Sequence, residues 1–338
     1  MTEEPRPAIK SIGVLGAGAW GTALAIAARR SGATVTLWAR REALAEAIAE
    51  ERENKPYLPG AKLDPAIRVT AELNQAAESE ALLLVVPAQH LRTLADKLRP
   101  LLPAERPLVI CAKGIEQQSG ALLSEVLADA LPGQPQAVLS GPSFAAEVAR
   151  DLPSAVTLAA RDVALGETLV AGLGSRHFRI YLSDDPIGAE IGGAVKNVIA
   201  IACGIVTGRG LGDNARAALI TRALAEIARL GRAKGAKAET FMGLSGLGDL
   251  LLTCSSTQSR NFSLGLALGE GRLLAALMRD RQSVVEGVFT AKAVARLASD
   301  LGVELPICAA VDAVVNRDAE IGGTIERLLA RPFRAETV

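Results

Sequence analysis

The sequence predicts an α/β domain built on a mostly parallel sheet, followed by an almost entirely helical domain. Strand-like and helix-like segments alternate up to about residue 184, as expected for a parallel sheet covered by helices on both faces. The run ALLLVV at 81–86 is continuously apolar, which is typical of a strand buried on both faces. From residue 186 onward, Ala-, Leu- and Ile-rich segments with helical spacing are separated by Gly-rich turns.

Local composition predicts each element in chain order. Apolar and β-branched residues predict strands at 9–15, 33–39, 67–70, 81–86, 107–111, 136–139, 154–160 and 178–182. Helical spacing predicts helices at 19–30, 42–52, 91–101 and 120–130, then at 188–207, 214–235, 262–279, 290–301 and 306–316. A length of 338 residues suits about two domains, so we place one domain at 1–185 and a second at 186–338.

The composition excludes several classes of protein. The 37 Lys+Arg balance the 37 Asp+Glu, which argues against nucleic-acid binding. Gly, Lys or Arg interrupts the apolar stretches before about 18 residues, so we expect no membrane-spanning segment, and residues 1–7 do not resemble a signal peptide. The chain has two histidines and no C-x-x-C pair, so we expect no metal, a reducing cytoplasmic setting, and four cysteines that serve in packing: Cys111, Cys203, Cys254 and Cys308.

The segment GAGAWG at 16–21 has the spacing G-x-G-x-x-G directly after a predicted strand and at the start of a predicted helix. In this context Gly16 allows a tight turn, Gly18 lets the backbone approach a pyrophosphate, and Gly21 lets the helix pack on the strand. We therefore expect a Rossmann-type dinucleotide site that includes Ala19 and Trp20. The alternative is an ordinary glycine-rich turn.

Arg40 and Arg41 follow the second predicted strand, where NAD-binding proteins usually carry Asp or Glu. An arginine pairs with a 2′-phosphate, whereas an acid repels it. These residues predict a preference for NADPH, with NADH as a second donor. The alternative is that both arginines are solvated charges at the start of a helix.

Six motifs occur in a fixed order: GAGAWGTALA (16–25), AKG (112–114), SGPSF (140–144), GGAVKNVI (192–199), GLSGLGDLLLTC (243–254) and SRN (259–261). Together they resemble the bacterial NAD(P)-dependent glycerol-3-phosphate dehydrogenase family over roughly residues 9–328. The resemblance implies reversible reduction of dihydroxyacetone phosphate to sn-glycerol 3-phosphate, which supplies glycerophospholipid synthesis. The sequence does not give the oligomeric state, but helical second domains of this kind often pair, which leaves a homodimer as one possibility.

Lys196 is an unusual charge within an apolar helical segment. Desolvation lowers the pKa of a buried lysine, which suits proton exchange with a hydroxyl or carbonyl oxygen. The residues alone leave this role balanced against a lysine whose head reaches solvent. The resemblance assigns Lys196 as the catalytic proton acceptor in alcohol oxidation.

The resemblance also assigns residues that bind the substrate and the cofactor. Substrate contacts are implied for Lys113, Gly141, Ser143, Lys196, Asp249, Ser259, Arg260 and Asn261, and further cofactor contacts for Lys113, Ala145, Arg260, Val284 and Glu286. Taken alone, each polar residue in these motifs has an ordinary alternative: a loop lysine, a helix N-cap or a solvated arginine. Asn197, Asn214 and His90 are weaker candidates for positions near the site.

Two other functions remain open from the sequence. One is a dehydrogenase of a β-hydroxy acid or a sugar-acid phosphate, which would share the two domains and the lysine. The other is an NADPH-sensing regulator that binds the cofactor without turnover. The joint presence of Lys196, Asp249 and Arg260 argues against the regulator.

Overall fold

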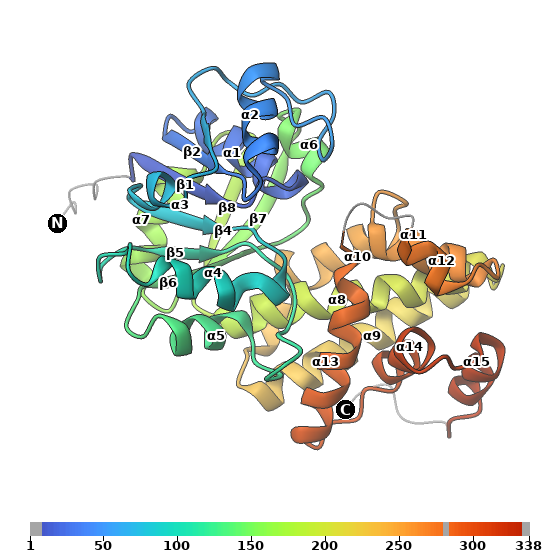
Figure 1. The fold of residues 1–338 in the computed structure, drawn as a ribbon. Helices are drawn as coiled ribbons and strands as arrows, with labels where there is room; N and C mark the ends of the chain where they lie inside the picture. The colour runs from blue at the N-terminus through green and yellow to red at the C-terminus, as the bar shows by residue number, and fades with distance from the viewer. Residues whose placement is uncertain (1–8, 280–283, 333–338) are drawn as a thin grey trace.

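The computed structural model describes residues 9–279 and 284–332, which form a sheet region (9–183) and a helical region (186–332; Figure 1). The eight strands lie in one sheet in the order β3-β2-β1-β4-β5-β6-β7-β8. They are β1 (Ser11–Leu15), β2 (Thr34–Trp38), β3 (Arg68–Thr70), β4 (Ala81–Leu84), β5 (Leu108–Ile110), β6 (Gln136–Ser140), β7 (Ser154–Ala159) and β8 (Phe178–Ser183). All neighbouring pairs are parallel except β6 and β7. The predicted fold class and all eight predicted strands are confirmed.

Helices cover both faces of this sheet. They are α1 (Ala19–Arg30), α2 (Glu42–Glu51), α3 (Leu73–Ala77), the 3-10 turn η1 (Ala88–His90), α4 (Leu91–Leu98), α5 (Leu123–Ala130), α6 (Ala145–Ala149) and α7 (Val163–Leu173). The sequence did not indicate α3 and α6, which are too short to show a helical period. It also missed α7, which is apolar on most sides and has no clear stripe.

The central strands alternate their side chains between two separate cores. Leu83 and Val109 pack with α1 on one face, while Leu82, Leu84 and Leu108 pack with α4 and α5 on the other. The strand order reverses at β1, because β2 and β3 lie on one side of it and β4 and the later strands lie on the other. Ligands of such sheets bind at this point, beyond the carboxyl ends of the strands.

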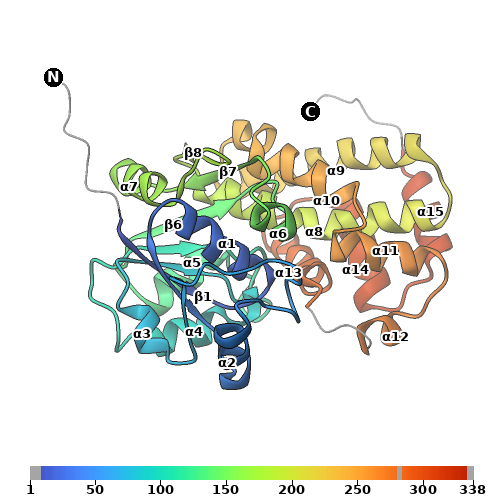
Figure 2. The ribbon, with the colours of Figure 1, turned by 90° about the horizontal axis from the view of Figure 1, so that it is seen from above.

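The helical region is arranged around α8 (Pro186–Gly208), which packs against α9, α10, α11, α13 and α14. Figure 2 shows α8 and α9 running side by side. The other elements are α9 (Asp213–Lys234), the short turns η2 (Ala238–Met242) and η3 (Leu244–Gly248), α10 (Asp249–Cys254), α11 (Arg260–Gly269), α12 (Leu274–Arg279), α13 (Glu286–Asp300), α14 (Pro306–Asn316) and α15 (Ile321–Leu329).

Helix α8 is longer than the helix predicted at 188–207, and it is strongly apolar. Within the described residues it is the one helix that is long and apolar enough to cross a membrane, with a mean hydropathy of 1.6 over its best 18 residues. However, 78% of that window is buried inside the protein. Although Lys196 and several Gly residues interrupt α8, as expected, the helix still reaches this hydropathy, and its burial is that of a core helix.

Two further differences concern helix ends. The single helix predicted at 262–279 is divided into α11 and α12, because the chain turns at Gly271, whose φ is +93°. Helix α13 begins at Glu286, four residues before the predicted start. The sequence did not indicate α15.

Candidate active site

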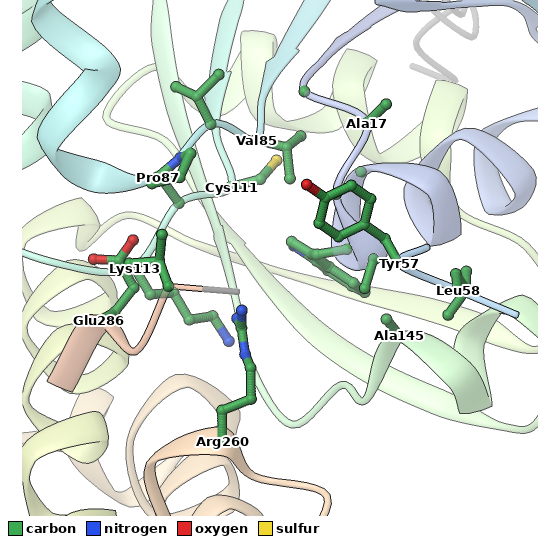
Figure 3. Close-up of a pocket in the computed structure, with 18 of the residues that line it drawn as sticks. Ala17, Tyr57, Leu58, Val85, Pro87, Cys111, Lys113, Ala145, Arg260 and Glu286 are labelled. Carbon is green, nitrogen blue, oxygen red and sulfur yellow. The ribbon is translucent and has the colours of Figure 1, made fainter. Parts of the chain in front are cut away.

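A cavity of about 860 Å³ lies between the carboxyl ends of the central strands and helices α8, α10 and α11 (Figure 3). Its wall includes the glycine loop, here residues 16–21, and the segments that follow β2, β4, β5 and β6. The helical region contributes side chains from α8, α10, α11 and the start of α13. Segments far apart in the sequence therefore meet at one site.

The three glycines of the glycine loop are present for different structural reasons. Gly16 has φ +125°, and a Cβ there would lie 2.9 Å from the Val85 carbonyl carbon. A Cβ on Gly21 would lie 1.8 Å from the Gly16 carbonyl oxygen. A Cβ on Gly18 would meet no atom within 4 Å, so this side of the loop faces open space. The fold thus requires Gly16 and Gly21, while Gly18 leaves room for a ligand at the start of α1.

The first turn of α1 is suited to an anion. Its N-cap residue Gly18 provides no side-chain cap, and the turn contains no acidic residue. Uncapped N–H groups and the helix dipole attract phosphate at such a position. Ala19 and Trp20 line the cavity here. A dinucleotide pyrophosphate fits this geometry.

Arg40 and Arg41 both line the cavity and are exposed. An Arg41 Nη2 donates a hydrogen bond to the Tyr57 hydroxyl at 3.3 Å. Arg40 makes no hydrogen bond or ion pair with any residue in the described ranges. Its guanidinium is therefore available to an anionic ligand.

A buried charged cluster joins the sheet region to the helical region. Lys196 on α8 is 7% exposed, and its Nζ donates to Asp249 Oδ1 and, at 2.8 Å, to Thr253 Oγ1. Lys113, three residues beyond β5, donates from Nζ to Asp249 Oδ2 at 2.6 Å and to the Gly141 carbonyl at 3.1 Å. Asp249, at 1% exposed, thus holds one lysine with each carboxylate oxygen.

The surroundings of Lys196 lower its pKa. Burial lowers its pKa to about 8, the positive charge of Lys113 acts in the same direction, and the Asp249 carboxylate opposes the shift. A group with this pKa exchanges protons readily near neutral pH. Lys196 is therefore not a snorkelling lysine, because its head is held inside the protein.

Four of the expected substrate residues make hydrogen bonds within the protein. Gly141 has φ +141°, and its carbonyl accepts hydrogen bonds from Lys113 and, at 3.1 Å, from Ser143 Oγ. Gly141 does not line the cavity, whereas Ser143 does. Ser259 Oγ caps α11 by accepting from the Phe262 N–H at 3.2 Å. Asn261 donates to Asn197 Oδ1 at 2.9 Å and accepts from the Gly287 N–H at 3.0 Å.

Arg260 enters the cavity from α11, opposite Lys113, which enters from the sheet side (Figure 3). Ser259 and Asn261 flank it in the cavity wall. Because this segment is the start of α11, backbone N–H groups and a guanidinium lie together there, as in phosphate sites of other proteins.

Glu286 lies at the start of α13, near the segment that follows β4. Its Oε1 accepts from the Ala88 N–H at 3.3 Å, and its buried Oε2 has no hydrogen-bond partner among the described residues. Burial raises the pKa of the Glu286 carboxyl, while the Ala88 N–H and the Arg260 charge act against this rise. Val284 and Ala145 also line the cavity, so each offers an apolar surface to a ligand.

The remaining candidates lie in different surroundings. His90 is an exposed residue of the cavity wall, whereas His177 pairs with Asp151 at 2.8 Å outside it. Asn214 is exposed in the first turn of α9 and does not line the cavity. All four cysteines are buried, and burial raises the pKa of the Cys111, Cys254 and Cys308 thiols, which suits packing. Within residues 9–279 and 284–332, no group of His, Cys, Asp or Glu side chains is placed to hold a metal ion.

The sequence analysis missed one wall of the cavity. Tyr57 and Leu58, in the loop after α2, line it on the same side as Ala17 and Ala145 (Figure 3). The sequence offers one weak signal for this wall, an aromatic residue between two prolines.

Comparisons with known proteins identify relatives of this chain. The N-terminal model of the NAD-dependent glycerol-3-phosphate dehydrogenases matches residues 11–165, and the C-terminal model matches residues 185–326. A glycerol-3-phosphate dehydrogenase [NAD(P)+] of Rhodospirillum rubrum is 59% identical over 97% of this chain and 94% of its own. One of Parvibaculum lavamentivorans is 55% identical over 98% and 99%. The crystal structure of glycerol-3-phosphate dehydrogenase from Coxiella burnetii has a TM-score of 0.93 and 39% identity, covering 96% of this chain and 100% of that chain.

Proposed function

The chain belongs to the NAD-dependent glycerol-3-phosphate dehydrogenase family, and on that premise we propose that Lys196 holds and delivers the proton of the reaction. The protein is an NAD(P)-dependent oxidoreductase that acts on a CH–OH group. It interconverts dihydroxyacetone phosphate and sn-glycerol 3-phosphate. The bound nicotinamide dinucleotide supplies or accepts the hydride.

The single observation that carries this role is the hydrogen bonding of Lys196. An ammonium has three N–H donors, and Asp249 Oδ1 and Thr253 Oγ1 take two of them. The third is left for the substrate oxygen. In the reducing direction Lys196 donates its proton to that oxygen as negative charge develops there, and in the oxidising direction the neutral amine accepts it.

Lys113 supports the same step by charge. Two of its N–H donors are used by Asp249 and the Gly141 carbonyl, so one remains for the substrate. Its positive charge stabilises a developing alkoxide and keeps the pKa of Lys196 low. The substrate phosphate is bound by Arg260 and the first turn of α11.

The glycine loop binds the pyrophosphate, and Arg40 with Arg41 binds the 2′-phosphate of NADPH, which makes NADPH the preferred donor over NADH. The Oε2 of Glu286, which has no hydrogen-bond partner among the described residues, accepts a hydrogen bond from the cofactor, and Ala145 and Val284 provide apolar contacts. These assignments are supported by the open face of Gly18 and by the guanidinium of Arg40, which is unpaired within residues 9–279 and 284–332.

We also propose that the enzyme acts in the cytoplasm as a homodimer. Four free, buried cysteines suit a reducing compartment. Exposed apolar residues Met242 and Leu251 on the helical region offer surface for pairing. Light scattering at several concentrations would test the dimer, and a monomer mass throughout would refute it.

Substrate turnover tests the function. Loss of NADPH absorbance should follow addition of dihydroxyacetone phosphate, and should not follow addition of a β-keto acid or of the ketone formed by oxidation of 6-phosphogluconate. Turnover of either alternative in place of dihydroxyacetone phosphate would assign a related dehydrogenase. Tight NADPH binding with no turnover of any of them would indicate a sensor.

A further inference from the structure

We propose that Asn54 and Thr22 are positioning residues for the cofactor: together they fix the glycine loop so that its N–H groups point at the pyrophosphate. This inference rests on the proposed function, because it takes the loop as the phosphate-binding element. Neither residue touches the reacting atoms. Both act through the backbone of residues 17–19.

The contacts form a short buried chain of hydrogen bonds. The Asn54 side chain is 0% exposed, and its Nδ2 donates to the Ala17 carbonyl at 3.0 Å and to Thr22 Oγ1 at 2.7 Å. Thr22, also 0% exposed, donates from Oγ1 to the Gly18 carbonyl at 2.9 Å. One amide and one hydroxyl therefore hold two consecutive carbonyls of the glycine loop.

These two bonds, together with the bond from the Thr22 backbone N–H to the Gly18 carbonyl at 2.9 Å, determine where the next N–H groups point. In a planar trans peptide unit the C=O and the following N–H point in opposite directions. Since the Ala17 carbonyl faces Asn54, the Gly18 N–H faces away from it. Since the Gly18 carbonyl faces Thr22, the Ala19 N–H faces away from the body of α1. Gly18 and Ala19 both line the cavity, and the space beside Gly18 is open.

Asn54 also connects the glycine loop to the wall that contains Tyr57. Its backbone carbonyl accepts the N–H of Tyr57 at 3.1 Å and that of Leu58 at 2.7 Å. Tyr57 is in turn hydrogen-bonded to Arg41 at 3.3 Å. A single buried residue after α2 thus supports both the pyrophosphate end and the adenosine-side wall of the cavity.

The variant Thr22→Val tests the inference, because it removes the hydroxyl and nearly keeps the shape of the side chain. We expect the Kd for NADPH, measured by fluorescence titration, to rise about tenfold, as for loss of one buried hydrogen-bonding group. Thr22→Ser keeps the hydroxyl and should restore wild-type affinity. The matched control is Thr221→Val, which removes the same kind of hydroxyl-to-carbonyl bond on α9 and should leave the Kd unchanged.

A fragment of the cofactor separates positioning from general damage. Adenosine 2′-monophosphate carries the base, ribose and 2′-phosphate but has no pyrophosphate, so Thr22→Val should bind it as wild type does. The kcat at saturating NADPH and the KM for dihydroxyacetone phosphate should also stay unchanged. The inference would be overturned if Thr22→Val bound NADPH with wild-type affinity, or if it lost affinity equally for NADPH and for adenosine 2′-monophosphate.

Asn54→Ala should raise the Kd for NADPH in the same way, and the double variant should lose less than the product of the two single effects. Fully independent effects would contradict a shared action through one loop. If Asn54→Ala does not fold, Thr22→Val alone decides. Failure of the wild-type protein to bind NADPH or to turn over dihydroxyacetone phosphate would instead refute the proposed function.

Discussion

At the scale of single residues, the proton chemistry depends on opposing effects at Lys196. Burial and Lys113 lower its pKa to about 8, while Asp249 raises it. In the mechanism that we propose, oxidation requires the neutral amine of Lys196 and reduction requires its ammonium form. The direction of the reaction should therefore determine the sign of the pH dependence.

The first prediction is a pair of opposite pH profiles. The kcat for oxidation of glycerol 3-phosphate should rise as the pH increases through about 8, and the kcat for reduction should fall over the same range. Asp249→Asn removes the charge that raises the pKa of Lys196, so both midpoints should move to lower pH. Initial rates between pH 6 and 10, with each step checked for enzyme stability, measure this. Unmoved midpoints in Asp249→Asn would contradict the role of Asp249.

The second prediction concerns Arg40. Arg40→Asp should lower the ratio of kcat/KM for NADPH over NADH by about tenfold or more, because one charge-assisted pair is lost and a repulsion is gained. The matched control is Arg161→Asp, which makes the same change of charge at an exposed residue outside the cavity wall. An unchanged ratio of kcat/KM for NADPH over NADH in Arg40→Asp would contradict the assignment of Arg40 to the 2′-phosphate.

Lys196 could be singled out from the sequence, because a charged residue inside an apolar helical segment is unusual. Its partners could be assigned only through the family resemblance, since Lys113 and Asp249 lie far away in the chain and meet through the fold. The sequence gives only a weak signal for Tyr57 and none for Asn54. An asparagine in a loop looks solvated until the structure shows that it is buried against the glycine loop.

At the scale of elements, the strands were predictable because each is a compact apolar run with clear ends. Their order was not, since pairing of β1 with β4 is decided by packing across the whole sheet. Helix ends such as Gly271 were missed because a glycine inside a helical pattern is ambiguous without its φ angle. The use of Gly141 as an internal acceptor was equally invisible.

The third prediction compares two glycines of one loop. Gly18→Ala places a methyl group in open space, so the free energy of unfolding should be unchanged while the Kd for NADPH rises. Gly21→Ala places it 1.8 Å from the Gly16 carbonyl oxygen, so the protein should lose about 1–3 kcal/mol of stability or fail to fold. Urea unfolding and NADPH titration measure the two effects. Equal behaviour of both variants would contradict the distinction.

At the scale of the whole molecule, α8 holds the sheet region and the helical region together. Buried Glu190 on α8 accepts hydrogen bonds from the Ser124 backbone N–H, at 2.9 Å, and from the Ser124 hydroxyl, both at the start of α5. The same helix carries Lys196 further along.

Although the net charge is zero, five cations line one cavity: Arg40, Arg41, Lys113, Lys196 and Arg260. A domain boundary near residue 185 stays a prediction, to be tested by expressing 186–338 alone.

The fourth prediction concerns pH and stability. Burial raises the pKa of Glu190 from 4.5 to about 7, so the folded protein binds the proton more tightly than the unfolded chain. Glu190 therefore makes its full contribution to the free energy of unfolding below pH 4.5. As the pH rises towards 7, this contribution, on the order of 3 kcal/mol, is lost. Urea unfolding should show this loss in the wild type and not in Glu190→Gln. An identical pH dependence of both proteins would contradict it.

The decisive experiment on the proton-exchange role of Lys196 is the variant Lys196→Ala, with turnover and NADPH binding measured on the same sample. We expect kcat to fall about 10²–10⁴-fold, as for loss of a general acid–base group, and the Kd for NADPH to stay close to that of the wild type. Turnover near the wild-type rate would contradict the role of Lys196 as the group that exchanges the proton.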